Sequence, residues 1–241
     1  MLKPKTHREM ANPQITARFL ADYMAASETA RRTIIRGCKY RPIARLIQHD
    51  EAKATITNFI LDETINLSNI LERAHQIRNK IAESDFEREL FQHNADYIET
   101  FASVYDKINL PTAEIGQSDR AQPITLSGTR VTIDFNFRLR RVTRTNKVKV
   151  GAASFRYSKG KALPKEVANW QSAFTYGYLN AIGVDESTEV EQALCLTIDA
   201  VTGAVHAAPG DSVRCFKNME AACASIADLW PNIKPPPKAV L

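Results

Sequence analysis

Carboxylates that could bind a metal ion or activate water are sparse in residues 123–165 of this 241-residue chain. Asp134 lies in a run of alternating apolar and polar residues, and Asp199 follows a short apolar run. Between Asp134 and Glu166 there is neither Asp nor Glu, so the segment 147–156 offers no second acidic ligand. Metal-assisted hydrolysis needs such ligands. We therefore expect no metal on this segment, and Asp134 and Asp199 would be catalytic only if the fold brought distant residues together.

Other signatures of catalysis are absent from the sequence. The glycines form neither a dinucleotide-binding nor a phosphate-binding loop, and no CxxC, HExxH or GxSxG motif occurs. His49, His75 and His93 lack the spacing of metal ligands. Four cysteines are scattered, as is typical of free thiols in a reducing compartment: Cys38, Cys195, Cys215 and Cys223. We expect no cofactor and a cytoplasmic location.

Positive charge is concentrated in two parts of the chain. The net charge is +7 over residues 1–48, −7 over 49–122, +9 over 123–162 and −4 over 163–241, against +5 overall. The third segment holds ten basic residues and one acidic residue. A cationic β-ribbon can lie against a phosphate backbone and release counterions. The alternative, a hairpin edge charged to prevent aggregation, usually requires only one or two charges.

The residues that we predict to bind nucleic acid lie in both basic segments. Those of the predicted hairpin are Arg138, Arg140, Arg141, Arg144, Lys147, Lys149, Arg156, Lys159 and Lys161. A second cluster, Arg31, Arg32 and Arg36, precedes a corner at residues 37–42 that is similar to a helix–turn–helix connection. We expect the six cations from Arg138 to Lys149 to contact phosphates, so that affinity falls steeply as salt rises, and we expect Arg140 and Arg144 to face solvent.

Two periodicities divide the elements that must position these residues. Apolar residues recur at helical spacing over residues 14–108, with Ser27 and Ser84 as N-caps, Gly37 as a helix stop and Pro42 in a first helical turn. After residue 123 the period changes to two. The fold class that we predict is α+β, with a helical N-terminal half followed by a small mixed β-sheet flanked by helices.

The predicted organisation has three parts. Residues 1–110 form a helical region, residues 111–122 a connection, and residues 123–241 an α/β region with the basic β-hairpin and a Pro-rich tail. Two or more strands within residues 14–108 would contradict the first part.

The predicted second half contains a long hairpin. We expect strands at 124–126, 130–142 and 147–158 with a bulge near residues 153–154, a helix at 165–182 and a strand at 192–200.

Together with a helix at 85–108, this order is α-β-β-β-α-β, which resembles the core of the PD-(D/E)xK nuclease superfamily over residues 85–200. In that family an Asp in one strand and an acidic-x-Lys triplet in the next strand bind metal ions. Asp134 matches the first position, and the second motif fails for lack of a carboxylate. The resemblance implies an inactive nuclease-like core that binds DNA or RNA, in a setting such as antiviral defence or mobile-element maintenance.

Two alternatives belong to other classes. One is a protein–protein adaptor whose acidic helices at 49–108 and basic hairpin dock partner proteins. The other is a metal-dependent nuclease assembled from residues such as Asp134 and Asp199. No apolar run approaches the roughly 18–20 residues that cross a bilayer, so we expect no membrane association.

Overall fold

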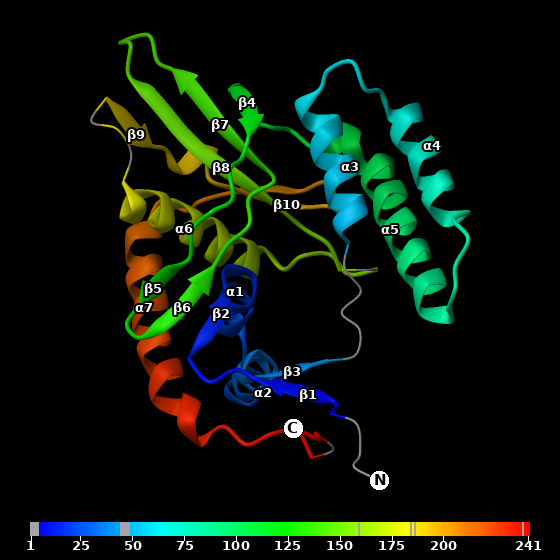
Figure 1. Ribbon diagram of the computed structural model, residues 1–241. Coiled ribbons are helices and arrows are strands. Elements are labelled where there is room, and N and C mark those ends of the chain that lie inside the picture. Colours follow the sequence, from blue (N-terminus) through cyan, green and yellow to red (C-terminus); the bar gives the residue numbers. More distant parts are fainter. Residues whose placement is uncertain (1–4, 44–48, 159, 184, 186, 238) are drawn as a thin grey trace.

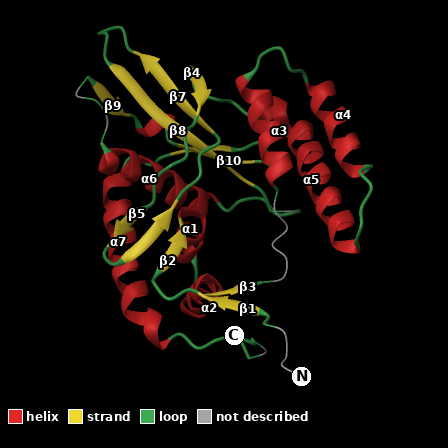
Figure 2. Cartoon of the chain, viewed as in Figure 1, coloured by secondary structure: helices red, strands yellow, loops and turns green. Residues whose placement is uncertain are grey.

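The structure is a computed structural model of the chain, and it describes residues 5–43, 49–158, 160–183, 185, 187–237 and 239–241. Helices and strands are mixed throughout, so the predicted α+β class is confirmed (Figure 1). A central sheet lies between helix α6 (Lys165–Ile182) on one face and a three-helix unit on the other. A smaller sheet and a two-stranded ribbon lie below it in the view of Figure 2.

The central sheet has six strands, in the order β11-β10-β8-β7-β4, with β9 pairing with the first half of β8. Strand β7 is antiparallel to both of its neighbours, β8 and β10 are parallel, and β11 is antiparallel to β10. The bounds are β4 (Glu114–Gln117), β7 (Phe137–Val142), β8 (Val148–Arg156), β9 (Thr188–Val190), β10 (Leu196–Asp199) and β11 (Val205–Ala207).

The core of the sheet is buried on both faces. Phe137, Leu139 and Leu196 pack toward the three-helix unit, while Ala152 belongs to the cluster on the α6 side. The ladder between β7 and β8 runs without interruption from Phe137–Ala153 to Val142–Val148. The predicted bulge near residues 153–154 is therefore wrong. The phase change in the sequence reflects burial on both faces, because β8 is buried at four consecutive residues, 151–154.

The three-helix unit consists of α3 (Asp50–Leu61), α4 (Leu67–Arg78) and α5 (Asp85–Val104). Ser84 caps α5 as predicted, accepting a hydrogen bond from the Glu87 amide. An ion-pair network of Arg78 with Asp96 (3.1 Å) and Glu99 (2.5 Å) joins α4 to α5. Phe101 packs against Phe155 of the sheet, so the unit is docked on the sheet through an apolar contact.

The N-terminal part joins the second half of the chain. Strand β2 (Gln14–Thr16) pairs in parallel with β6 (Thr129–Thr132), and β6 pairs with β5 (Ile124–Leu126). Helix α1 (Ala17–Ala25) follows β2, and its buried Leu20 and Tyr23 share one core with residues of α6 and of α7 (Ser212–Leu229). The predicted division at residues 111–122 stays a prediction, but these contacts cross it.

Two strands lie within residues 14–108, which contradicts the expectation of helices alone in that range. They are β2 and β3 (Tyr40–Pro42), and β3 pairs with β1 (His7–Glu9). Each has three residues, too few for a period of two to be visible. Helix α2 (Glu28–Lys39) begins after Ser27 as predicted but passes through Gly37. Pro42 ends a strand and does not open a helix, so the predicted helix–turn–helix-like corner is wrong.

The predicted strand at 130–142 is two strands in two different sheets. Residues 133–136 leave the small sheet after β6 and enter the central sheet at β7. The first strand of the α-β-β-β-α-β order is β4, within the predicted connection, and not residues 124–126. The elements α5, β4, β7, β8, α6 and β10 follow one another in that order, with β5 and β6 of the small sheet inserted between β4 and β7 and with β9 inserted between α6 and β10.

Short helices and the tail complete the fold. Three 3₁₀ helices are η1 (Tyr105–Lys107), η2 (Gln192–Leu194) and η3 (Trp230–Asn232). The C-terminal segment returns to the N-terminus, where the Val240 carbonyl accepts from the Thr6 amide at 2.8 Å. Buried Lys39 donates to the Trp230 carbonyl at 2.8 Å and fixes the end of α7. Within the described residues, no helix is long and apolar enough to cross a membrane.

Candidate functional site

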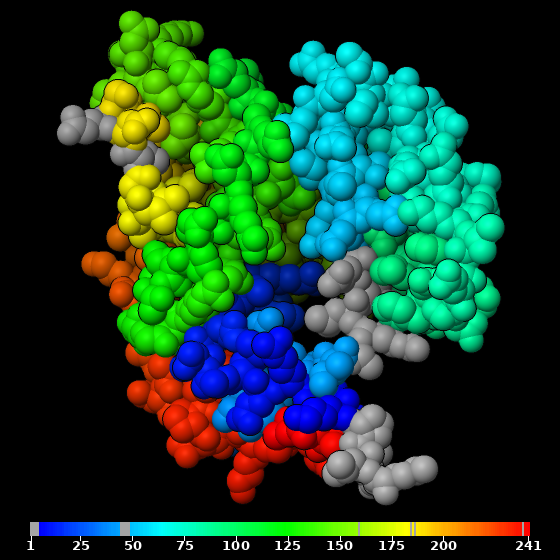
Figure 3. All heavy atoms as spheres, viewed as in Figure 1, coloured from blue at the N-terminus to red at the C-terminus, as the bar shows by residue number. Residues whose placement is uncertain are grey.

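A cavity of about 760 Å³ lies where the central sheet, α1 and α3 meet. The start of α1 and residues 132–136 form one side, α3 forms the other, and the end of β8 forms the floor. Figure 3 shows the surface hollowed between the cyan helices and the green and blue segments. This is the cleft referred to below.

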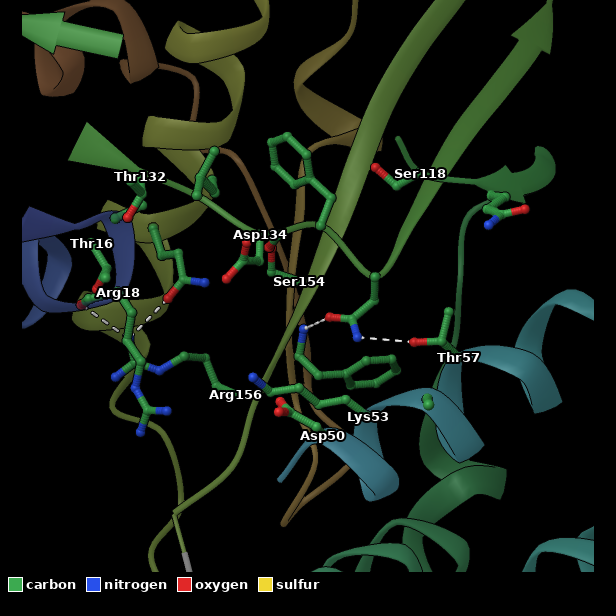
Figure 4. A pocket seen from close by; sticks show the side chains of 18 of the residues that line it. Thr16, Arg18, Asp50, Lys53, Thr57, Ser118, Thr132, Asp134, Ser154 and Arg156 are labelled. Carbon is green, nitrogen blue, oxygen red and sulfur yellow. Dashed lines mark hydrogen bonds between the residues drawn. The ribbon is translucent and has the colours of Figure 1, made fainter. Parts of the chain in front are cut away.

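The break between β6 and β7 shapes the cleft. The side chain of Asn136, which lies in this break, forms two hydrogen bonds. Its Oδ1 accepts from the Phe155 main-chain amide at 2.8 Å, and its Nδ2 donates to Thr57 Oγ1 at 3.1 Å. One side chain therefore ties the connection to both β8 and α3. This bracing leaves Asp134 exposed and lining the cleft (Figure 4).

The place on β8 beside Asp134 is occupied by Ser154. Its hydroxyl donates to the Asp134 main-chain carbonyl at 2.7 Å, and the serine is buried. This position on β8 therefore offers a hydroxyl that is engaged with the backbone, and no carboxylate. Among the described residues, no group of three or more His, Cys, Asp or Glu side chains is placed to hold a metal ion.

Asp199 serves a turn and does not line the cleft. It is only 2% exposed and accepts hydrogen bonds from the Leu163 amide (2.9 Å), the Val201 amide (2.9 Å) and the Thr202 hydroxyl (2.6 Å). The structure therefore does not bring Asp134 and Asp199 together in one cavity. Both Asp199 oxygens stabilise the chain reversal between β10 and β11.

Arg156 forms part of the cleft floor and is 6% exposed. Its guanidinium donates to Asp22 Oδ1 at 2.7 Å, to Gln171 Oε1 at 2.9 Å and to the Arg18 carbonyl at 3.1 Å. Burial lowers the pKa of Arg156, and the Asp22 carboxylate opposes that shift. Arg156, which the sequence predicted to bind nucleic acid, is therefore a buried residue that ties β8 to α1 and α6.

Two exposed cations of the cleft have no carboxylate partner among the described residues. Arg18 on α1 and Lys53 on α3 both line it, and neither forms an ion pair with a described residue. Arg18 does donate one hydrogen bond to the Tyr157 carbonyl at 3.3 Å. Figure 4 shows that Arg18, Lys53 and Arg156 reach the cleft from three different elements, with Asp50 close to Lys53. No sequence pattern pointed to Arg18 or Lys53, since they stand 35 positions apart and outside any motif.

The hairpin cations are largely paired with carboxylates of neighbouring strands. The pairs are Arg138–Asp119 at 3.6 Å, Arg140–Glu114 at 2.9 Å, Arg141–Glu191, Lys147–Glu189 at 3.1 Å and Lys149–Glu189. Hydrogen bonds from Lys149 and Lys147 lower the pKa of Glu189. With Arg144, six cations face four carboxylates, so the net charge of this surface is +2 and not +6.

The remaining predicted cations are distributed as follows. Arg144 and Lys161 are exposed, without an ion pair to a described residue. Lys159 lies outside the described residues. Arg31 donates to the Tyr23 carbonyl at 2.9 Å and the Met24 carbonyl at 3.0 Å, so it closes the end of α1. The other two also lie on α2. Arg32 pairs with Glu28 at 2.5 Å, and the buried Nε of Arg36 has no hydrogen-bond partner within the part of the chain that the structure describes.

A histidine–tyrosine cluster lies next to the cleft, where α3 begins. The His49 ring packs edge-on against Tyr97 and Tyr157, with centroids 5.6 and 5.4 Å away, and those two tyrosines stack at 4.0 Å. The Nδ1 atom of His49 is buried, and no described residue forms a hydrogen bond with it. Burial, followed by the charges of His93, Lys53 and Arg18, lowers the pKa of His49. The cluster therefore favours neutral imidazole.

No protein-family model matches the chain, and no curated protein matches it in sequence. The function must accordingly be inferred from the geometry of the cleft and the elements that form it.

Proposed function

We propose that this protein binds nucleic acid in the cleft without cutting it. The observation that carries the proposal is that Arg18 and Lys53, which have no carboxylate partner among the described residues, line the same cleft as Ser154. The cleft is formed on a sheet of α-β-β-β-α-β order. That order supports the resemblance to the PD-(D/E)xK superfamily. Asp134 occupies the first acidic position, and Ser154 occupies the place beside it on β8.

Phosphate is the group that best fits the free cations. An exposed lysine or arginine without a carboxylate partner can take up a phosphate and release its counterions. Arg18 and Lys53 meet this condition, whereas most hairpin cations already have partners. Exposed ion pairs are worth at most about 1 kcal/mol, so a phosphate can compete for the hairpin cations too. The hairpin is accordingly a secondary contact in this proposal.

Cleavage is not part of the proposal because the chemistry lacks its ligands. Metal ions in phosphodiester hydrolysis bind carboxylates that converge on the attacking water. Asp134 offers one carboxylate, Ser154 offers none, and Asp199 is occupied in its turn. A cytoplasmic setting accompanies the proposal, since all four cysteines are free thiols.

The proposal is tested by fluorescence anisotropy with labelled oligonucleotides at about 50 mM and 200 mM salt. Arg18→Ala/Lys53→Ala should weaken binding at least tenfold at the lower salt and flatten the log–log salt slope by roughly one to two units. The matched control, Arg140→Ala/Arg144→Ala, removes the same charge from the hairpin and should change affinity less. If no oligonucleotide binds at about 50 mM salt, the proposal is wrong and the protein–protein adaptor becomes the favoured interpretation.

A further inference from the structure

An exposed aromatic ring stands at the edge of the cleft. Phe19 is 46% exposed and lines the cavity, whereas Leu20 and Tyr23 of the same helix are buried in the core. Leaving a ring of this size in water forgoes part of the roughly 1.5–3 kcal/mol gained by burying such a side chain. Its ring is therefore accessible from the cavity, where a flat ligand group can stack on it.

Two further rings line the same cavity. Phe135 comes from the connection between β6 and β7, Phe155 comes from β8, and both are half-buried. Phe19 directly follows Arg18 in the chain, and Lys53 reaches the cavity from the other wall. Cations beside accessible rings form the combination that binds unpaired nucleotides, since phosphates meet the charges and bases stack on the rings.

The shape of the cavity also favours an unpaired strand. Its volume of about 760 Å³ lies within the range of pockets that enclose small ligands. The Asn136–Thr57 hydrogen bond of 3.1 Å crosses between its walls, so the floor is closed to a body as wide as a duplex. A duplex also keeps its bases stacked on one another, and it would gain nothing from Phe19.

We infer that the cleft takes a single-stranded segment of DNA or RNA, with a base stacked on Phe19 and flanking phosphates at Arg18 and Lys53. This inference rests on the proposed function, and it adds the strand state of the ligand. The experiment below distinguishes DNA from RNA, because the Phe19 ring and the two cations can bind the bases and phosphates of either.

The test compares 15-nucleotide single-stranded DNA, RNA of the same sequence and the matching DNA duplex, by anisotropy at about 50 mM salt. At least one single strand should bind at least tenfold tighter than the duplex. Phe19→Ala should weaken that binding by roughly 5- to 150-fold and leave the duplex unchanged. Phe19→Leu, which keeps the apolar volume, should show a smaller loss of the same kind.

The controls separate the two levels of inference. Leu229→Ala removes a side chain of the same 46% exposure from α7 and should leave binding unchanged. Two results would overturn the single-strand inference and leave the proposed function standing. One is a duplex that binds as tightly as both single strands. The other is wild-type binding by the Phe19 variants while Arg18→Ala/Lys53→Ala binds more weakly. If nothing binds, both are overturned. Circular dichroism of each variant shows that the fold is retained.

Discussion

Arg156 is the residue whose environment departs most from what its sequence neighbourhood suggests. It belongs to a segment of ten cations, yet it is buried and bonded to groups from α1 and α6. Nothing within residues 123–162 reveals this, because Asp22 and Gln171 lie outside that segment. A charge count along the chain therefore overestimates the cations available to a ligand.

Replacing Arg156 should cost stability and not simply affinity. Arg156→Ala leaves the Asp22 carboxylate and buried Gln171 without their donor, and breaking a buried pair costs about 3–5 kcal/mol. We expect a loss near the lower end, about 3 kcal/mol, since the Asp22 side chain retains 29% exposure. Urea denaturation measures this loss. Arg156→Lys keeps the charge and should lose less, whereas a change below about 1 kcal/mol in Arg156→Ala would show that the network is not structural.

At the scale of elements, the periodicity predicted the long helices and the strands around the hairpin turn. α5 and α6 lie where apolar spacing places them, and β7 and β8 lie on either side of residues 143–147, between the two predicted strands. The short strands β2 and β3 were not predicted, because three residues are too few to show a period of two. The break at residues 133–136 was not predicted, because apolar and polar residues alternate through it without a change. Only the pairing partners differ: β6 pairs with β2 and β5, and β7 pairs with β4 and β8.

The candidate site was accessible to sequence reasoning only in part. Asp134 was identified, and the missing carboxylate on β8 was recognised from composition. Arg18, Phe19 and Lys53 were not, because the cleft joins residues from α1, α3 and the β6–β7 connection that only the fold brings together. The hairpin carboxylate partners likewise come from β4, β9 and adjacent loops.

The His49 cluster lies where the three-helix unit meets α1 and the end of β8. The groups facing His49 are His93 and Tyr97 of α5, Tyr157, Arg18, and Lys53 and Asp50 of α3. Its pKa in the folded state lies below the ordinary 6.5, so the unfolded chain binds the proton more readily. Stability must then rise with pH while His49 titrates, and it must fall as pH drops below about 6.5.

Urea denaturation between pH 5 and 8 measures this effect. His49→Phe keeps a ring for the tyrosines and removes the titration, so the variant should lose less stability than the wild type as pH falls. A single titrating group accounts for a difference of at most about 1.4 kcal/mol per pH unit. Since burial also lowers the pKa of His206, the wild type and the variant share a common slope, and only their difference reports His49. Parallel curves for the two proteins would assign the pH dependence elsewhere.

At the scale of the whole molecule, the cleft joins three parts that are distant in sequence. The N-terminal segment supplies Arg18 and Phe19, the three-helix unit supplies Lys53, and the central sheet supplies Ser154 and Arg156. The three-helix unit is docked through the aromatic contacts of α5 and the Asn136–Thr57 hydrogen bond. Binding in the cleft would therefore depend on the docked arrangement of all three parts.

The location of bound nucleic acid is the most direct measure of the central claim. A 15-nucleotide single strand carrying photoreactive 5-iodouracil is crosslinked to the wild-type protein, and the modified peptides are identified by mass spectrometry. Crosslinks are expected on peptides that carry Phe19 or Phe135, with the Arg18→Ala/Lys53→Ala variant losing them. Crosslinks confined to the hairpin turn around Arg144, and unchanged in that variant, would contradict binding in the cleft.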